Sequence, residues 1–184
     1  QQSDYPDLQN SAAVTVSAAG APVTSAGQVV LSNATIRDNV IHNAAGIYIQ
    51  ADPGRTGTPA YAPSTFSNVT IAHNNFSRSA APILAVEAAQ NAAVESNWVD
   101  CSGHQAEPQG TTCAFFSQVA SSLVQNNVLM NMPNTNSPDE TGIDFEYKIQ
   151  NTAVRGNYFA NNAGAGIELL QLAGRPGDFS TGNT

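Results

Sequence analysis

The feature that most constrains the fold of this chain is a short motif that recurs five times. Each copy begins with a small polar residue, has an aliphatic residue three positions later and an asparagine six positions later, and ends on an apolar residue. Self-similarity at such spacing is typical of solenoids, in which each repeat buries its apolar face against its neighbours. The motif asparagines are Asn39, Asn74, Asn97, Asn127 and Asn157, and they lie 35, 23, 30 and 30 residues apart.

A second apolar segment follows every motif after a loop of variable length. Apolar residues alternate with other residues in these segments, which predicts β-strands with one buried face. In the fourth segment, Ile143 and Phe145 are expected to point inward, leaving Asp144 and Glu146 on the outer face. The five segments are Gly46–Gln50, Pro82–Glu87, Cys113–Ser117, Gly142–Tyr147 and Gly166–Leu170.

The motif asparagines suggest how the chain turns between strands. Asparagine tolerates left-handed backbone angles better than any residue except glycine, so we expect each of these asparagines to occupy a left-handed position in a bend. Stacked coils place equivalent side chains one strand spacing apart, about 4.8 Å. We therefore also expect their amides to bond to one another in a ladder.

The pattern predicts one all-β domain over residues 1–184, a parallel β-helix of about five to six coils. Residues 1–27 are expected to form a degenerate first coil, residues 28–171 the regular coils and residues 172–184 a tail. Solenoids need polar caps at their ends, and the sequence shows no amphipathic capping helix at either end. Either the chain is a fragment of a longer helix or a partner chain covers the exposed rung, and we favour the first.

Composition excludes several classes of protein. With 41% apolar and 11% charged residues, the chain does not have the low hydrophobicity and high charge of a disordered segment. A net charge of -8 leaves no basic stripe for nucleic acid. Because no apolar run approaches the roughly 20 residues of a membrane span, we expect neither a nucleic-acid nor a membrane partner.

The two cysteines, Cys101 and Cys113, flank a polar loop. Two cysteines that close one loop in an asparagine-rich, charge-poor chain favour a disulfide and an oxidising compartment, and hence a secreted protein. Two buried thiols are the alternative. A metal pair is disfavoured because no second cysteine or histidine pair stands at ligand spacing.

The asparagine-centred turns followed by Gly-Ile strands, as in residues 157–167, resemble the right-handed parallel β-helix superfamily with the pectin-lyase-like fold. The resemblance covers residues 28–171 and implies a right-handed solenoid from the carbohydrate-active branch. That superfamily includes polysaccharide lyases, glycoside hydrolases, uronan epimerases, pectin esterases and phage tailspikes, so the fold does not define the reaction. The Gly-His-Gly and Arg-Ile-Lys motifs of polygalacturonase-like hydrolases are absent, as is the Trp-Ile-Asp-His segment of pectate-lyase-like enzymes.

Acidic residues are few, so their grouping is informative. Asp144 and Glu146 alternate on one predicted strand, Glu168 falls at or near the matching position of the next coil, and Glu87 is expected on the same face two coils earlier. The resemblance implies that this strand face forms the floor of a saccharide groove. Hydrolysis of a glycosidic bond needs two carboxyl groups, one of them protonated, and neighbouring carboxylates raise one another's pKa. The leading hypothesis is a secreted glycoside hydrolase acting on a polysaccharide, with Asp144 and Glu146 as the acid/base pair and Glu168 supporting them.

Other readings of the same residues stay open. A lyase or epimerase acting on uronan would bind Ca²⁺ through these carboxylates, because the net charge otherwise repels an anionic polysaccharide. Its base would be Lys148, Arg155 or His104. A structural or glycan-binding β-helix would use the acids only as a solvated sheet face. Apart from possible Ca²⁺, no cofactor is expected.

Aromatic side chains on outer-facing or turn positions suit sugar stacking. We expect Tyr48, Trp98 and Phe116 at such positions, with Tyr48 the strongest candidate for a sugar contact. The expected substrate-binding residues are Glu87, Tyr48, Lys148 and Arg155.

Overall fold

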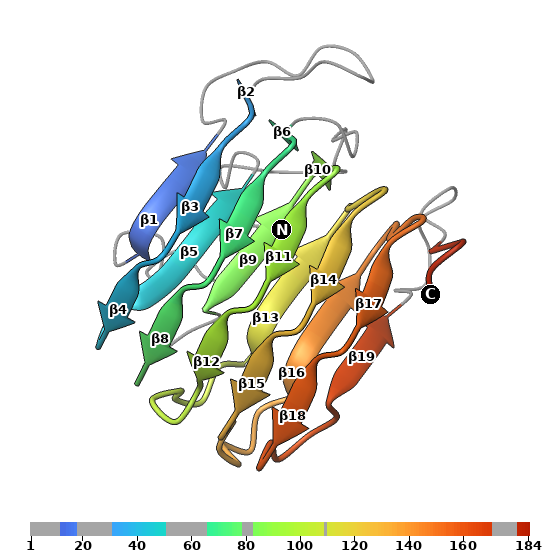
Figure 1. Ribbon diagram of the computed structural model, residues 1–184. Helices are drawn as coiled ribbons and strands as arrows, with labels where there is room; N and C mark the ends of the chain where they lie inside the picture. The colour runs from blue at the N-terminus through green and yellow to red at the C-terminus, as the bar shows by residue number, and fades with distance from the viewer. Residues whose placement is uncertain (1–11, 18–30, 51–65, 79–82, 109, 171–179) are drawn as a thin grey trace.

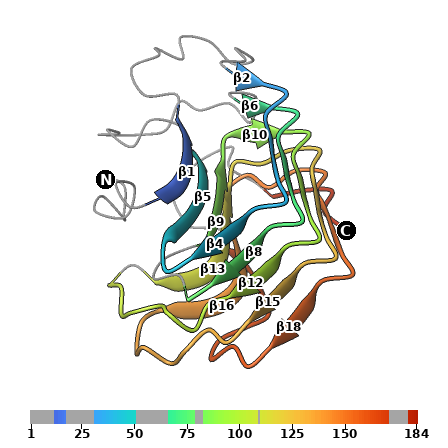
Figure 2. The same ribbon diagram turned by 60° about the vertical axis from the view of Figure 1, so that its left-hand side comes forward.

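The computed structural model describes residues 12–17, 31–50, 66–78, 83–108, 110–170 and 180–184. Within these ranges the chain consists of strands and turns, and strands from successive coils pair in parallel to form four sheets (Figure 1). The first three coils pass through all four sheets in the same order, and the later described coils have only an isolated bridge in place of a strand in one of the sheets. Figure 2 shows the coils from a second side. The predicted parallel β-helix is therefore confirmed.

Sheet A, the longest, contains β1 (Ala12–Ser17), β5 (Ala45–Gln50), β9 (Leu84–Glu87), β13 (Thr111–Ser117), β16 (Asp139–Glu146) and β19 (Ile167–Leu170). Sheet B contains β2 (Leu31–Ser32), β6 (Phe66–Ser67) and β10 (Ala89–Gln90). Sheet C contains β3 (Thr35–Arg37), β7 (Thr70–Ala72), β11 (Ala93–Glu95), β14 (Leu123–Gln125) and β17 (Ala153–Arg155). Sheet D contains β4 (Val40–His42), β8 (Asn75–Ser77), β12 (Trp98–Asp100), β15 (Val128–Met130) and β18 (Tyr158–Ala160).

The core is built from columns of apolar side chains that stack from coil to coil. The aliphatic residue of each motif points inward from sheet C and its last apolar residue points inward from sheet D, in unbroken register. Sheet A adds Phe116 and Phe145, whose ring centroids lie 5.0 Å apart. The expectation that Phe116 faces outward is wrong, because Phe115 takes the outer position and Phe116 is buried in the core.

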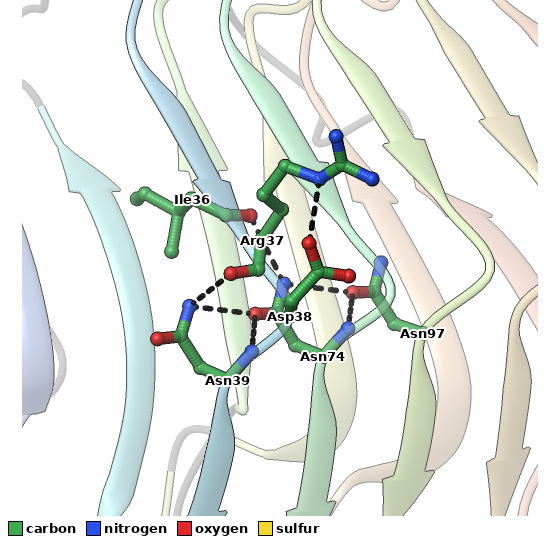
Figure 3. Close-up of polar contacts among 6 residues, drawn as sticks. All are labelled: Ile36, Arg37, Asp38, Asn39, Asn74 and Asn97. Atoms are coloured by element: carbon green, nitrogen blue, oxygen red, sulfur yellow. Dashed lines mark hydrogen bonds and ion pairs between the residues drawn. The ribbon is translucent and has the colours of Figure 1, made fainter.

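The motif asparagines form the expected ladder at the bend between sheets C and D (Figure 3). Nδ2 of Asn74 donates to Oδ1 of Asn97 at 3.0 Å and to the carbonyl oxygen of Ile36 at 3.1 Å. The backbone N–H of Asn74 donates to the same Oδ1 of Asn97 at 3.0 Å. This pattern repeats at Asn97 and Asn127, so the side chains satisfy the backbone groups that the bend leaves without a strand partner.

The prediction that the motif asparagines themselves have left-handed backbone angles is wrong. The left-handed residue is the one immediately before each asparagine, and the one drawn in Figure 3, Asp38, points its side chain away from the core. Asparagine recurs at the motif position because its amide both donates and accepts inside the bend, which no apolar residue can do. The left-handed residues are Asp38, His73, Ser96, Asn126 and Gly156, with φ between 55° and 64°.

Cys101 and Cys113 form the predicted disulfide, with Cα atoms 5.8 Å apart. His104, inside the closed loop, is buried, and its two ring nitrogens lie 3.0 and 3.1 Å from the carbonyl oxygens of Cys101 and Thr112. His104 therefore joins the two ends of the loop. This leaves neither nitrogen available as the base that a lyase would require.

The predicted strand boundaries shift by one to three residues, and the largest differences lie at β16 and at the described C-terminal end. Strand β16 begins at Asp139, three residues before the predicted segment, and so shortens the loop expected before it. Residues 180–184 pair with the preceding coil: Thr181 bridges Gln150, and Oδ1 of Asn183 accepts the backbone N–H of Thr152 at 3.0 Å. The described end of the chain is therefore part of the solenoid and not a separate tail. Most of the predicted first coil, and the loop over residues 51–65, lie outside the described residues.

We predict that Asn97→Ala lowers the free energy of unfolding by about 3 kcal/mol or more, because buried groups of Asn74, Ile71 and Asn127 each lose a partner. Asn39→Ala is the matched control, since Asn39 is the exposed end of the ladder and its loss should cost less than about 1 kcal/mol. Urea unfolding followed by circular dichroism measures both. Equal losses would show that the ladder is not what stabilises the bend.

Candidate acidic site on sheet A

Strand β16 presents two acids on the outer face of sheet A. Ile143 and Phe145 enter the core, so the alternation of the strand directs Asp144 and Glu146 outward, as the sequence predicts. Their Cα atoms are about 6.6 Å apart, two strand residues at about 3.3 Å each. Glu146 is partly exposed, but Asp144 is only 3% exposed although it lies on the outer face.

Asp144 is the unusual group of this face. Its Oδ1 is buried and, among the described residues, has no hydrogen-bond partner. Burial, followed by the negative charges of Glu146, Asp139 and Glu168, raises the pKa of Asp144 from 3.8 to about 8. The Asp144 carboxyl therefore stays protonated at neutral pH, where ordinary aspartates are ionised.

Glu168 lies directly beside Asp144 on the next strand. The register pairs Asp144 of β16 with Glu168 of β19, one strand spacing or about 4.8 Å apart. Burial and the neighbouring charge of Asp139 raise the pKa of Glu168 as well. The coil register thus brings together two acids that lie 24 residues apart in the sequence (168 − 144).

Asp139 belongs to the same cluster, although the sequence analysis did not identify it. Asp139 and Glu140 both have left-handed backbone angles, with φ of 71° and 53°, at a bulge where β16 gains one residue relative to Thr111 and Thr112 of β13. A Cβ on Gly110 would lie 1.8 Å from Oδ2 of Asp139, so only glycine fits beneath this carboxylate. The sequence signal was two adjacent acids in an acid-poor chain, just before the predicted strand.

Glu140 holds the adjoining loop and does not face the cluster. Its Oε1 accepts the backbone N–H of Thr135 at 2.6 Å, the Thr135 hydroxyl at 3.0 Å and the backbone N–H of Ser137 at 3.3 Å. Burial acts to raise the pKa of Glu140, but these hydrogen bonds outweigh it and the net shift is downward. Glu140 thus remains ionised and ties the loop over residues 135–137 to the start of β16.

Glu87 and Tyr48 lie on the same face but farther from Asp144. The register places Glu87, Ser117 and Glu146 in one column, so Glu87 is about 9.6 Å, two strand spacings, from Glu146. Tyr48 shares the column of Asp144, with Ala85 and Phe115 between them. Tyr48 is only 2% exposed, and burial raises the pKa of its hydroxyl. It is therefore a buried side chain and not the exposed sugar platform that was expected.

The two expected cationic residues occupy different places. Lys148 follows β16 in a turn and has a left-handed φ of 48°. Arg155 lies on sheet C, where its Nε donates to Oε1 of Gln125 at 3.1 Å and Nε2 of Gln125 donates to Oε2 of Glu95 at 2.8 Å. The fold therefore places Arg155 in a column with Gln125 and Glu95, away from the acids of sheet A.

The described residues contain no group of three or more histidine, cysteine, aspartate or glutamate side chains arranged to hold a metal ion.

A cavity of about 270 Å³ opens at the C-terminal end of the core, where Phe145, Ile149, Ile167 and Leu169 are among its lining residues. This cavity is apolar and does not lie over the acids. The same described part has no helix with the length and hydrophobicity needed to cross a membrane.

The parallel coils and the internal asparagine ladder define a parallel β-helix protein. One of its outer strand faces carries the clustered acids. Residues 2–176 match the sequence profile of the family described as the right handed beta helix region, and the chain belongs to that family. Its solenoid is thus right-handed, as the resemblance implied. No curated protein and no solved structure shows significant similarity to the chain.

We predict that Asp144→Asn makes the protein more stable than the wild type at alkaline pH. The folded protein holds the Asp144 proton up to about pH 8, whereas the unfolded chain releases it above about 3.8, so wild-type stability falls as pH rises between these values. Asparagine does not titrate, and the variant should gain more than about 1 kcal/mol over the wild type between about pH 4 and pH 8.

Urea unfolding at a series of pH values measures this difference. Glu95→Gln, which replaces an acid on sheet C, is the matched control and should keep the wild-type slope. If the difference in the free energy of unfolding between Asp144→Asn and the wild type is the same at every pH, Asp144 titrates normally.

Proposed function

We propose that this protein is a glycoside hydrolase that cleaves a polysaccharide lying across the outer face of sheet A. The observation that carries the proposal is Asp144, a buried carboxyl group that keeps its proton to about pH 8 beside other acids. Protonation of the leaving oxygen of a glycosidic bond requires such a group. The family match supports the fold and leaves the reaction open.

In this proposal Asp144 is the general acid and Glu146 is the ionised partner. Glu146 is the largest charge influence on Asp144 and shares its strand and face. Because Asp144 is only 3% exposed, the side chains that cover it must move aside before one substrate contacts both groups. Burial is the main reason that Asp144 keeps its proton, and the charges of Asp139 and Glu168 add to the effect of Glu146. A Cα separation of about 6.6 Å lets the two carboxyl groups approach either the ~5 Å of retaining enzymes or the ~6.5–9.5 Å of inverting ones.

We infer that the substrate is an uncharged polysaccharide. The acid cluster and the net charge of -8 repel uronic acids, and the charge influences on Asp144 come only from other acids. A polyuronate would need a bridging cation such as Ca²⁺ to lie on this face. We further infer a secreted enzyme, because the disulfide between Cys101 and Cys113 suits an oxidising compartment.

Removal of the acid tests the proposal directly. With a panel of neutral polysaccharides, Asp144→Asn and Glu146→Gln should each lower the release of reducing ends by at least about 100-fold, the usual contribution of a positioned acid or base. Glu95→Gln on sheet C should leave turnover unchanged. Full activity of Asp144→Asn would exclude the hydrolase, and an EDTA-sensitive product with the absorbance of an unsaturated uronate would indicate a lyase instead.

The pH profile gives a second test. Activity should fall as pH rises through about 8, because Asp144 then loses the proton that it donates. Glu168→Gln removes one negative neighbour, so the pKa of Asp144 should drop and the alkaline limb should move to lower pH while activity at pH 5 is retained to within about tenfold. An unmoved alkaline limb would exclude the charge coupling between Glu168 and Asp144.

A further inference from the structure

The outer face of sheet D carries an exposed strip of apolar and aromatic side chains. The register places one outward residue from each strand in a single column that runs along the solenoid axis. Two of its members are aromatic and strongly exposed: Trp98 at 47% and Tyr158 at 59%. The column consists of Val40, Asn75, Trp98, Val128 and Tyr158.

The spacing of the two aromatic residues follows from the fold. Trp98 lies on β12 and Tyr158 on β18, with Val128 of β15 between them, so their positions are two strand spacings or about 9.6 Å apart. Parallel pairing keeps these strands side by side in one sheet (Figure 1). That separation is comparable to the length of a disaccharide unit in an extended glycan, so alternate sugar rings would meet Trp98 and Tyr158.

Polar groups border the strip on one side. Nδ2 of Asn131 donates to Oδ1 of Asp100 at 3.2 Å, and Nδ2 of Asn161 donates to Oδ1 of Asn131 at 3.2 Å. A sugar ring has an apolar face that packs on an aromatic ring, and hydroxyl groups at its rim that need hydrogen-bond partners. The aromatic side chains of the strip supply the surface for packing, and the side chains of Asp100, Asn131 and Asn161 beside it supply hydrogen-bond partners.

Charge favours a neutral ligand over a second copy of this chain. The described strands of sheet D contain one acidic residue, Asp100, and no lysine; their only other ionisable side chain besides the Tyr158 hydroxyl is His42. The face therefore carries few charges, with Arg78 just after β8 acting on Asp100, in a protein of net charge -8, and two copies would repel each other. An exposed apolar patch with a polar rim marks an interaction surface, and ligand-binding grooves are one form of it.

We propose that the outer face of sheet D is a carbohydrate-binding surface, separate from the acidic site of sheet A, that holds an extended uncharged glycan on Trp98 and Tyr158. The glycan lies along the solenoid axis and crosses successive strands. β-1,4-linked chains of neutral sugars have the flat, extended form that this strip requires, whereas α-1,4-linked glucan coils away from it. The surface would keep the protein on its polysaccharide whether or not sheet A is catalytic.

The single tryptophan of the chain makes a direct test possible, because intrinsic tryptophan fluorescence reports on Trp98 alone. Asp144→Asn, used to prevent hydrolysis, is titrated with β-1,4-linked hexasaccharides of glucose, mannose and N-acetylglucosamine, and with maltohexaose as the coiled control. At least one β-1,4-linked sugar should shift the emission to shorter wavelength in a saturable manner. Maltohexaose should not.

Variants on the strip identify the contact. In the same background, Tyr158→Ala keeps the fluorophore and should weaken binding roughly tenfold, the effect of losing about 1.4 kcal/mol, and Tyr158→Phe should restore it. Val40→Ala, an exposed apolar residue two strands away from Trp98, is the matched control and should bind as before. Circular dichroism melting checks that each variant is folded.

Four outcomes would overturn the proposal. No emission shift with any β-1,4-linked sugar, or an equal shift with maltohexaose, would exclude an extended-glycan surface. Unchanged affinity of Tyr158→Ala would place the sugar elsewhere. A shift that depends on protein concentration without sugar, with a dimer in sedimentation, would show that this face binds a second copy. Because binding is measured without turnover, these results are independent of whether Asp144 is a catalytic acid.

Discussion

Parallel hydrogen bonding between successive coils is the constraint on which the rest of this structure depends. It stacks each residue on its equivalent in the coils before and after, at about 4.8 Å. A continuous stack requires that the chain turn sharply inside every coil without leaving backbone groups unpaired. The asparagine ladder meets that requirement between sheets C and D, where Asn74, Asn97 and Asn127 bind one another and the neighbouring backbone.

The same stacking turns single residues into columns, and the columns give each outer face its chemistry. On sheet A, the pairing of β16 with β19 sets Asp144 beside Glu168, and the bulge at the start of β16 adds Asp139. On sheet D, the pairing of β12, β15 and β18 aligns Trp98 with Tyr158. A one-residue change of register would turn either set of side chains from the outer face to the core.

Several sequence predictions were correct because they rest on local alternation. The two-residue period of β16 is sufficient to place Ile143 inside and Asp144 outside, and the disulfide loop followed from cysteine spacing. The errors have a common origin in contacts that alternation does not encode. Phe116 and Phe115 are adjacent apolar residues, so the pattern did not reveal which one faces the core. Trp98 is exposed as expected, but the exposure of Tyr48 was misjudged, since it depends on what packs over an outer face.

The sequence by itself determined that the chain folds into stacked coils, where the bends fall and, in strands with a clear alternation such as β16, which residues face outward, because these properties depend on spacing within one coil. The sequence placed Glu168 only at or near the position that matches Asp144, and the tertiary structure fixed which outward residues become neighbours. The loops between strands vary in length, so the register between coils comes from hydrogen bonding and core packing. That register placed Glu168 beside Asp144, put Arg155 on another sheet and gave Asp144 the burial that raises its pKa.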